Sequence, residues 1–293
     1  MMGNANVIDL PHQYGHYTLH EELGNGVFGT VFKASQTMQR PIALKIFEQE
    51  RLSVAQREVA YLVKIKDLRS DRLCKMLTHY TINKHVAIAF ELMYQSVYDV
   101  LKHFEFRGFK MRTTRMIARD VLHGLAALHN AHIAHCDLKP ENIMFCTAQC
   151  KRVKIIDFGL ARSSPCGQAT YAQSRYYRAP EVVLGIGSDV LIDIWSLGCI
   201  LPELFTGRVL FKAKTEEELA AFHKGVEGDY PVGMQARSIR SNRFFRAVGG
   251  GCVADMPSAD TAYGAFVRAC VTVDPSKRFD AHAALQHPFI EEV

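Results

Sequence analysis

The chain has 293 residues, which allows either one large bilobal unit or two domains of ordinary size. Hydrophobic residues make up 48% and charged residues 22% of the chain, which excludes a disordered tail, a collagen-like repeat and a coiled-coil rod. The net charge of +5 comes without a dense basic run, so nucleic acid is not an expected partner. The longest apolar stretch is too short to span a bilayer, and we expect no secretory signal at the N-terminus.

The N-terminal part is predicted to consist mainly of strands. Residues 17–47 contain β-branched and aromatic runs bounded by Gly and Pro, and similar runs return at 73–81 and 85–92. Between them, residues 53–66 place apolar side chains at helical spacing. This order predicts a small sheet accompanied by one long helix.

The rest of the chain is predicted to be mostly helical. Residues 113–130 repeat apolar side chains at helical spacing, and a turn-rich segment follows at 134–185. Helices are expected from there to the end. One of them contains Pro202, which should kink or end it. The fold class is therefore expected to be α+β, with a β-rich part before a larger helical part.

Eight cysteines are spread along the chain. A core of this size needs no disulfide bonds, so we interpret them as reduced thiols of an intracellular protein, cytoplasmic or nuclear. Cys146 and Cys150 lack a second Cys or His pair at zinc spacing, and we expect only a loop there.

A glycine-rich segment lies between the first two expected strands. Gly24, Gly26 and Gly29 would let backbone N–H groups approach phosphates, which a Cβ atom would obstruct. The same spacing also marks dinucleotide-binding folds, in which a helix follows, and many such strings are simple turns. Here another strand follows, which favours a hairpin over phosphates.

A lysine on the next strand is a candidate phosphate ligand. Lys45 can pair with nucleotide phosphates, although most isolated strand lysines simply face water. Glu58 lies thirteen residues further on, in the expected helix, and could form an ion pair with it.

The turn-rich segment contains the most specific motif. Residues 135–142 read HCDLKPEN, DFG begins fifteen residues after Asn142, and APE follows at 179–181. Phosphoryl transfer needs a group that accepts the hydroxyl proton, ligands for a metal ion and a cation near the γ-phosphate. Asp137, Asn142 with Asp157, and Lys139 can supply these roles.

On these motifs the chain resembles the eukaryotic protein kinases over residues 17–289. Within them it is similar to the CMGC group, and in particular to the dual-specificity tyrosine-regulated (DYRK/Yak-type) kinases. The narrower resemblance lies in Cys136 of the HCDLKPEN motif and in the stretches at 96–101, 106–108, 171–181 and 192–199. It implies a bilobal kinase fold with an extension at 1–16, an N-lobe at 17–92 and a C-lobe at 93–293.

The resemblance also implies where ATP and Mg²⁺ would bind. Asn142 and Asp157 would hold the metal. The residues expected to contact the nucleotide are Leu23, Gly24, Asn25, Gly26, Val27, Phe28, Gly29, Thr30, Val31, Ala43, Lys45, Phe90, Glu91, Met93 and Met144. Each of the apolar ones could also be an ordinary core residue.

Further residues acquire roles from the same resemblance. Ser174 would bond Asp137 and Lys139, and Glu141 and Glu203 would bind an arginine three residues upstream of the phosphorylated one. Structural roles fall to Glu181, expected to pair with Arg278, and to Asp193, expected to tie down the catalytic loop. Regulation would centre on Tyr171, whose phosphate Arg175 and Arg178 would hold; without it, the two arginines would lack an anion.

The sequence therefore indicates a monomeric, ATP- and Mg²⁺-dependent Ser/Thr kinase that autophosphorylates Tyr171 and acts on proline-directed sites in proteins. A pseudokinase scaffold is the main alternative, but Lys45, Asp137 and Asp157 are all present. A CMGC kinase of another type, such as a homeodomain-interacting kinase without tyrosine autophosphorylation, is a second. A nucleotide-dependent oxidoreductase would need a helix after the glycines.

Overall fold

The computed structural model describes residues 13–26, 29–36, 39–82, 85–149, 152–167, 172–240 and 255–292. The chain divides into two compact units, one comprising Met1–Lys66 with Cys74–Met93, the other Asp67–Leu73 with Tyr94–Val293. Each unit is described by itself.

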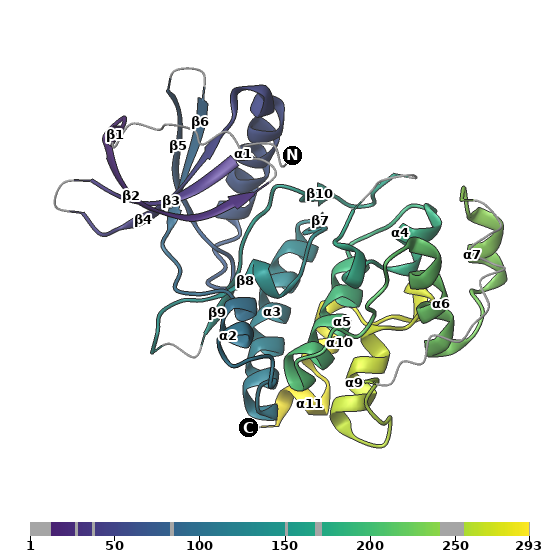
Figure 1. Ribbon diagram of the computed structural model, residues 1–293. Helices are drawn as coiled ribbons and strands as arrows, with labels where there is room; N and C mark the ends of the chain where they lie inside the picture. The colour runs from purple at the N-terminus through teal and green to yellow at the C-terminus, as the bar shows by residue number, and fades with distance from the viewer. Residues whose placement is uncertain are drawn as a thin grey trace, which may run out of the picture. The chain divides into compact units, whose positions relative to one another are not determined.

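The first unit is built on a six-stranded antiparallel sheet with the strand order β1-β2-β3-β4-β6-β5 (Figure 1). The strands are β1 (Gln13–Tyr14), β2 (Tyr17–Gly26), β3 (Gly29–Ser35), β4 (Ile42–Phe47), β5 (Met76–Ile82) and β6 (His85–Glu91). Helix α1 (Leu52–Asp67) follows a short 3-10 turn, η1 (Gln49–Arg51). The predicted strands and the helix between them are all present.

Strand register separates the two faces of this sheet. One face carries a core that includes Leu44, Ile46 and Ala89, packed against Tyr14 and Tyr17. Side chains alternate along a strand, so Ala43 and Lys45 point to the opposite face. That face is the one on which the functional residues of the first unit gather.

The second unit is mostly helical. Its helices are α2 (Val97–His103), α3 (Met111–Asn130), α4 (Pro180–Leu184), α5 (Leu191–Thr206), α6 (Glu216–Glu227), α7 (Val232–Arg237), α9 (Ala262–Cys270), α10 (Ala281–Leu285) and α11 (Pro288–Glu291). Its short strands are β7 (Ile133–Ala134), β8 (Ile143–Phe145), β9 (Val153–Ile155) and β10 (Arg162–Ser163), and its 3-10 turns are η2 (Pro140–Asn142), η3 (Arg175–Tyr177) and η4 (Pro275–Lys277).

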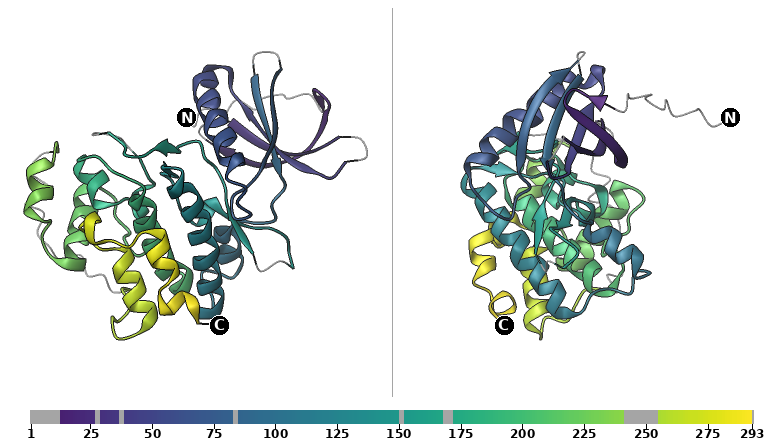
Figure 2. Two further views of the ribbon diagram at one scale, coloured as in Figure 1. Left: turned by 180° about the vertical axis from the view of Figure 1, so that it is seen from behind. Right: turned by 90° about the vertical axis from the view of Figure 1, so that its left-hand side faces the viewer.

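Helices α3 and α5 form the centre of this unit. Helix α3 packs against α5, α10 and α11, as Figure 2 shows, and α5 packs against α9. Nearly all of α5 is buried, including Trp195 in its second turn. Two short antiparallel pairs, β7 with β10 and β8 with β9, hold the turn-rich segment between these helices. This segment carries the candidate catalytic residues.

Pro202 does not end its helix, so the expectation of a helix end at this residue is wrong. Helix α5 continues for four residues beyond it to Thr206, whose Oγ1 donates to the carbonyl of Pro202 at 2.8 Å. The helix ends at Gly207, which has a positive φ of 76°. Burial of the surrounding residues holds the helical backbone in place despite the missing N–H donor. Among the described residues, no helix combines the length and apolar character needed to cross a membrane.

Candidate active site

The glycine-rich segment joins β2 and β3 as a hairpin. The structure has a strand after the glycines, so the dinucleotide-fold alternative is wrong. A Cβ atom on Gly29 would lie 2.2 Å from the carbonyl oxygen of Ile46, so the approach of β3 to β4 requires this glycine. A Cβ on Gly24 would meet nothing within 4 Å, and one on Gly26 only the Gly29 carbonyl at 3.7 Å. Packing therefore explains Gly29 alone and leaves the other two open to a ligand role.

The other described residues of this hairpin differ in exposure. Leu23 and Asn25 are exposed, and Thr30 is buried at the start of β3. The expected contacts of Val27 and Phe28 lie outside the described residues.

Four predicted nucleotide residues share the sheet face opposite the first unit's core. Val31 is opposite Lys45 in the ladder, and Ala43 is opposite Phe90. Because directly paired residues point to the same side, as do residues two apart on a strand, all four side chains lie on one face. The first and last of these residues are 59 positions apart in the sequence, and the sheet register brings all four together.

Lys45 and Glu58 form the expected ion pair. The Lys45 Nζ atom lies 2.8 Å from both carboxylate oxygens of Glu58, which projects from α1. Glu58 is 1% exposed and Lys45 9%. A buried pair of this kind is costly to break from one side, because the remaining charge stays out of water. Glu58 therefore fixes the position of the ammonium group.

Residues 90–93 form the end of β6 and the segment after it. The Glu91 N–H donates to the carbonyl of Lys75 at 3.1 Å, and the Glu91 carboxylate accepts from the Lys75 N–H at 2.8 Å. Phe90 is half-buried, and Met93 lies two residues beyond the strand. In the second unit, Met144 is a half-buried residue of β8 that forms a bridge with Ser96.

Both oxygens of the Asp137 carboxylate are held by polar contacts in the second unit. Its Oδ1 accepts from the Ser174 N–H at 3.1 Å and from the Ser174 hydroxyl at 2.8 Å. Its Oδ2 lies 2.9 Å from the Lys139 ammonium and accepts from Asn142 Nδ2 at 3.3 Å. Burial lowers the pKa of Lys139, but Asp137, Glu141 and Asp157 outweigh it and raise that pKa overall. Lys139 therefore remains a cation beside the carboxylate.

The loop that carries Asp137 is held by buried polar groups. Asp193 is fully buried and accepts from the backbone N–H groups of His135 and Cys136 at 2.8 and 3.0 Å, as expected. His135 Nε2 bonds the Ile156 carbonyl at 2.9 Å, and its Nδ1 accepts from the Asp137 N–H at 3.2 Å, which assigns the ring proton to Nε2. Cys136 has a φ of 66°, so these bonds stabilise an unfavourable backbone conformation.

Asn142 and Asp157 are the candidate metal ligands. Asn142 Nδ2 donates to the Asp137 carbonyl at 2.8 Å, which leaves its carboxamide oxygen as the atom with ligand chemistry. Asp157 has a φ of 59°, and its neighbour Phe158 is buried against the His135 ring at 5.4 Å. No group of three His, Cys, Asp or Glu side chains within the described ranges could hold an ion. Two oxygen donors without a protein cage suit a magnesium ion completed by phosphate oxygens and water.

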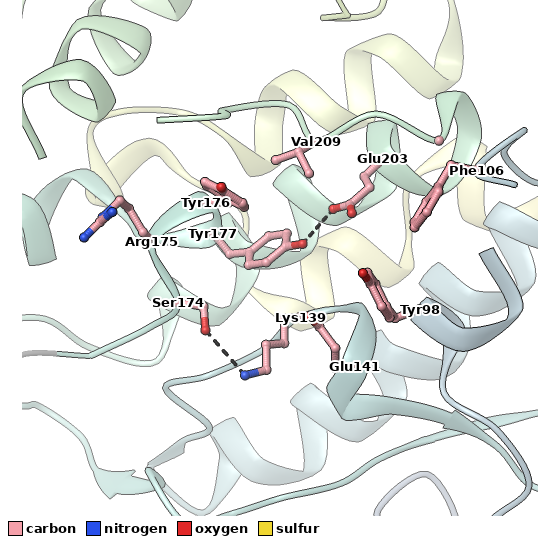
Figure 3. Close-up of a pocket in the computed structure, with 11 residues that line it drawn as sticks. Tyr98, Phe106, Lys139, Glu141, Ser174, Arg175, Tyr176, Tyr177, Glu203 and Val209 are labelled. Carbon is pink, nitrogen blue, oxygen red and sulfur yellow. Dashed lines mark hydrogen bonds between the residues drawn. The ribbon is translucent and has the colours of Figure 1, made fainter. Parts of the chain in front are cut away.

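A cavity of about 460 Å³ extends from this cluster (Figure 3). It is lined by Tyr98, Phe106, Lys139, Glu141, Ser174, Arg175, Tyr176, Tyr177, Glu203, Gly207 and Val209. Glu203 is 3% exposed and accepts from the Tyr177 hydroxyl at 2.8 Å. Burial raises the pKa of Glu203 to about 7, with a further contribution from the charge of Glu141 and an opposing one from the Tyr177 hydroxyl.

One of the two arginines expected to bind a phosphate, Arg178, already has an anionic partner, which corrects the expectation that it would lack one. Arg178 is 2% exposed, pairs with Glu216 at 2.8 Å and donates to the carbonyls of Ala172 and Gln173. Arg175 is exposed and donates to the Lys214 carbonyl at 2.6 Å. Glu216 supplies the anion that the sequence pattern did not reveal. Tyr171 lies outside the described residues.

Gln173 was not predicted as part of the site. It is 3% exposed with a φ of 63°, and its N–H donates to the Cys136 carbonyl at 2.7 Å. Its amide nitrogen bonds Tyr177, Ile192 and Ser196, and its amide oxygen accepts from the Ala179 N–H. Gln173 thus joins the catalytic loop to the segment that carries Ser174. A single glutamine in a loop gives no sequence signal for this role.

The fold and this cluster together define a protein kinase, and comparison with known families agrees. The family described as "Protein kinase domain" matches residues 17–290, so the chain belongs to that family. The crystal structure of the kinase domain of PF14_0431 superimposes with a TM-score of 0.83 at 23% identity, covering 94% of this chain and 95% of that one. It confirms the fold.

The relatives with similar sequences are dual-specificity kinases, as expected. "Dual specificity tyrosine-phosphorylation-regulated kinase 2" of Drosophila melanogaster is 32% identical over 99% of this chain and 43% of its own length. A "Probable dual specificity protein kinase YAK1 homolog" of Encephalitozoon cuniculi is 36% identical over 80% of this chain and 58% of its own length. The resemblance to DYRK/Yak-type kinases is confirmed, and the chain spans about half the length of these relatives. Membership of the protein kinase domain family implies the use of ATP with a divalent metal ion.

Proposed function

We propose that the chain is an active dual-specificity protein kinase that transfers the γ-phosphate of Mg-ATP to Ser or Thr of protein substrates and autophosphorylates Tyr171. The observation that carries this proposal is the Asp137 carboxylate, held by Ser174, Lys139 and Asn142 beside an open cavity. A scaffold without catalysis would have no need to orient these groups.

Each residue of the cluster has a chemical task. Asp137 orients the acceptor hydroxyl and takes up its proton, because both carboxylate oxygens are fixed by hydrogen bonds. Lys139 places positive charge where the transferred phosphoryl group gains negative charge. In the first unit, the Glu58 carboxylate holds the Lys45 ammonium in position to bind nucleotide phosphates.

Mg²⁺ would be held by Asn142 and Asp157, and when bound it would neutralise charge on the phosphate oxygens. The oxygen donors of these two side chains fit a hard cation. The glycines at 24 and 26, which packing does not require, and the shared sheet face of Val31, Ala43, Lys45 and Phe90 support nucleotide binding by the first unit.

The preferred substrate would be a Ser or Thr followed by Pro, with Arg three residues upstream. The proline preference rests on the resemblance of residues 175–181 to CMGC kinases. The arginine preference is supported by Glu141 and Glu203, which line the same cavity as Ser174 and offer carboxylates to a guanidinium group. We further propose that the protein acts as a monomer in the cytoplasm or nucleus, without binding nucleic acid or membranes.

The test is mass spectrometry of purified protein after incubation with Mg-ATP, alone and with a peptide library. The expected products are Ser-Pro and Thr-Pro phosphopeptides and protein phosphorylated at Tyr171. The Asp137→Asn variant is the control for contaminating kinases. If the wild-type protein and this variant gave the same products, or neither gave any, the proposed function would be wrong.

A further inference from the structure

The cavity extends beyond the residues to which the proposed function assigns a task. Lys139 and Ser174 lie with the catalytic carboxylate, and Glu141 and Glu203 serve the upstream arginine. The rings of Tyr98 and Phe106 face the cavity on the side away from Ser174 and Arg175 (Figure 3). The two rings give this end an aromatic lining that neither catalysis nor arginine binding uses.

The position of Phe106 is maintained against an unfavourable backbone conformation. Glu105 and Phe106 have φ values of 54° and 55°, a region that residues with a Cβ atom rarely adopt. Such residues persist only where the surrounding structure fixes them, and they concentrate at functional sites. Here the Phe106 N–H donates to the Leu101 carbonyl at 2.8 Å, which secures the turn after α2.

Two glycines allow this turn to approach the end of α5. A Cβ atom on Gly207 would lie 1.6 Å from the Phe106 carbonyl oxygen, and one on Gly108 would lie 2.1 Å from the carbonyl of Phe205. The Phe109 N–H also donates to the Leu204 carbonyl at 2.6 Å. The turn is therefore fixed by direct backbone contact with the helix that carries Glu203.

This fixed turn leaves an aromatic ring in contact with solvent. Phe106 is 39% exposed, and its ring meets that of Tyr98 edge-on at 5.8 Å between centroids. A strained backbone that presents a partly exposed phenylalanine to a cavity gains nothing for core packing. Burying the exposed part of these rings under a ligand would be favourable.

We propose that Phe106 and Tyr98 form a subsite for a large apolar side chain of the substrate, upstream of the arginine bound by Glu141 and Glu203. This inference rests on the proposed function. The occupant is a peptide because the apolar end is continuous with the cavity that contains Ser174 and Lys139. An aliphatic or aromatic side chain fits because no carboxylate lines this end besides those assigned to the arginine.

The end of α5 sets the position of this subsite along the substrate. Glu203 lies in α5, and Gly207, which lies against the Phe106 backbone, caps the helix four residues later, a rise of about 6 Å. An extended peptide covers about 3.3 Å per residue, so the subsite lies roughly two residues beyond the arginine. With Arg three residues upstream of the phosphorylated residue, the apolar residue is expected about five residues upstream.

The test compares kcat/KM for synthetic Ser-Pro peptides that share the upstream Arg and differ five residues upstream, with Leu, Phe, Ala, Arg or Asp there. The wild-type protein is expected to prefer Leu and Phe over Ala by about 5- to 20-fold, as for a partly buried side chain in a pocket. Phe106→Ala should reduce this ratio to about 2-fold or less. Phe106→Asn should do the same, and it tolerates the positive φ better.

Phe104→Ala is the matched control. Phe104 lies two residues away, is 55% exposed, contacts His103 and does not line the cavity, so its variant should keep the full preference. Equal rates for Leu and Ala peptides, a preference for Arg over Leu, or an equal loss in Phe104→Ala would overturn the subsite while leaving the kinase assignment intact. Failure to phosphorylate any peptide would instead overturn the proposed function, and the subsite with it.

Discussion

Asp137 is the residue to which the proposed function assigns the proton transfer. Asp137→Asn keeps the size of the side chain and one acceptor oxygen, so the hydrogen bond from the Ser174 hydroxyl can persist. The amide cannot take up a proton from the substrate, and we expect kcat to fall by about 10²- to 10⁴-fold. Steady-state kinetics with a phosphorylatable peptide measure this. Retention of more than a tenth of wild-type kcat would show that another group accepts the proton.

The buried carboxyl group of Glu203 destabilises the folded protein when it ionises. Its folded-state pKa is raised from 4.5 to about 7, first of all by burial. The folded protein therefore binds a proton more tightly than the unfolded chain, and stability is lost as pH rises from about 4.5 to 7. The loss at pH 8 is up to roughly 3 kcal/mol, taking 1.36 kcal/mol per pKa unit.

The matching variant is Glu203→Gln, which still accepts a hydrogen bond from Tyr177 but cannot ionise. At pH 8 it should unfold at a higher temperature than the wild-type protein, and the difference should disappear towards pH 5. It should also lose much of the preference for the upstream arginine. Glu141→Gln is the control, because that residue is exposed: it should affect arginine preference without the gain in stability. Calorimetry at pH 5 and pH 8 decides between these outcomes. Equal stability of the wild-type protein and Glu203→Gln at pH 8 would show that the pKa of Glu203 is not raised in the folded state.

At the scale of elements, strand register brings together four scattered residues, three of which had been assigned only through the family resemblance. The alternation of β3, β4 and β6 places Val31, Ala43, Lys45 and Phe90 on one face. The continuation of α5 through Pro202 could not be predicted from the sequence, because it depends on packing around the helix. The pairing of Arg178 with Glu216 could not be predicted either, since it joins segments 38 residues apart.

The β4–α1 pair can be tested by a double-mutant cycle. Lys45→Met leaves the Glu58 carboxylate buried without its cation, and Glu58→Gln leaves the ammonium without its anion. Each single change should destabilise the protein, by about 3–5 kcal/mol for a fully buried pair. The double variant should lose at least about 1 kcal/mol less than the sum. Urea unfolding gives these values, and additivity within about 0.5 kcal/mol would mean that the two groups do not interact in solution.

Arg175 and Arg178, which follow Gln173, are not equivalent. A test of tyrosine regulation is therefore sharper when the two arginines are substituted separately. Arg178→Ala would leave two carbonyls without their buried donor and Glu216 with only its longer pair to Arg240 at 3.5 Å, so we expect it to unfold the segment whether or not Tyr171 is phosphorylated. Arg175→Ala should cost little stability, because Arg175 is exposed and has one carbonyl partner described.

Arg175→Ala is therefore the variant for kinetics. In phosphorylated protein it should lower activity towards a Ser-Pro peptide, about as much as Tyr171→Phe does. Combined with Tyr171→Phe it should have no further effect, because the anion it would bind is already missing. Peptide mapping of the bacterially expressed protein establishes the state of Tyr171 in each sample. Full activity with unmodified Tyr171 would exclude the tyrosine switch.

At the scale of the whole molecule, the fold followed from the sequence because two kinds of evidence coincided. Strand and helix periodicities gave the order of elements, and the HCDLKPEN, DFG and APE motifs gave a family whose fold fits that order. The substrate cavity could not be foreseen in the same way. Its lining comes from residues between 98 and 209, and the positive φ of Phe106 and Gln173 becomes visible only in three dimensions.

Binding of Mg-ATP should stabilise the whole chain against unfolding. A ligand that binds only the folded state stabilises it by about 2.7 kcal/mol at 100 times its Kd. For a chain of this length that corresponds to a Tm increase of roughly 5 °C or more. Mg-ATP should produce such a shift, and EDTA should remove the part that depends on the metal. Differential scanning fluorimetry measures both effects without requiring turnover.

Two variants test the assignment in each unit separately. Lys45→Met in the first unit and Asp157→Asn in the second should each reduce the Mg-ATP shift by more than half, and Asp157→Asn should also make it insensitive to EDTA. The controls are Lys33→Met, which removes an exposed lysine paired with Glu21 on the adjacent strands, and Asp229→Asn, which removes an exposed carboxylate paired with Lys224. Both controls should keep the full shift, because these pairs lie outside the residues assigned to ATP and metal. If Lys45→Met and Asp157→Asn retained it as well, the nucleotide would have to bind elsewhere on the protein.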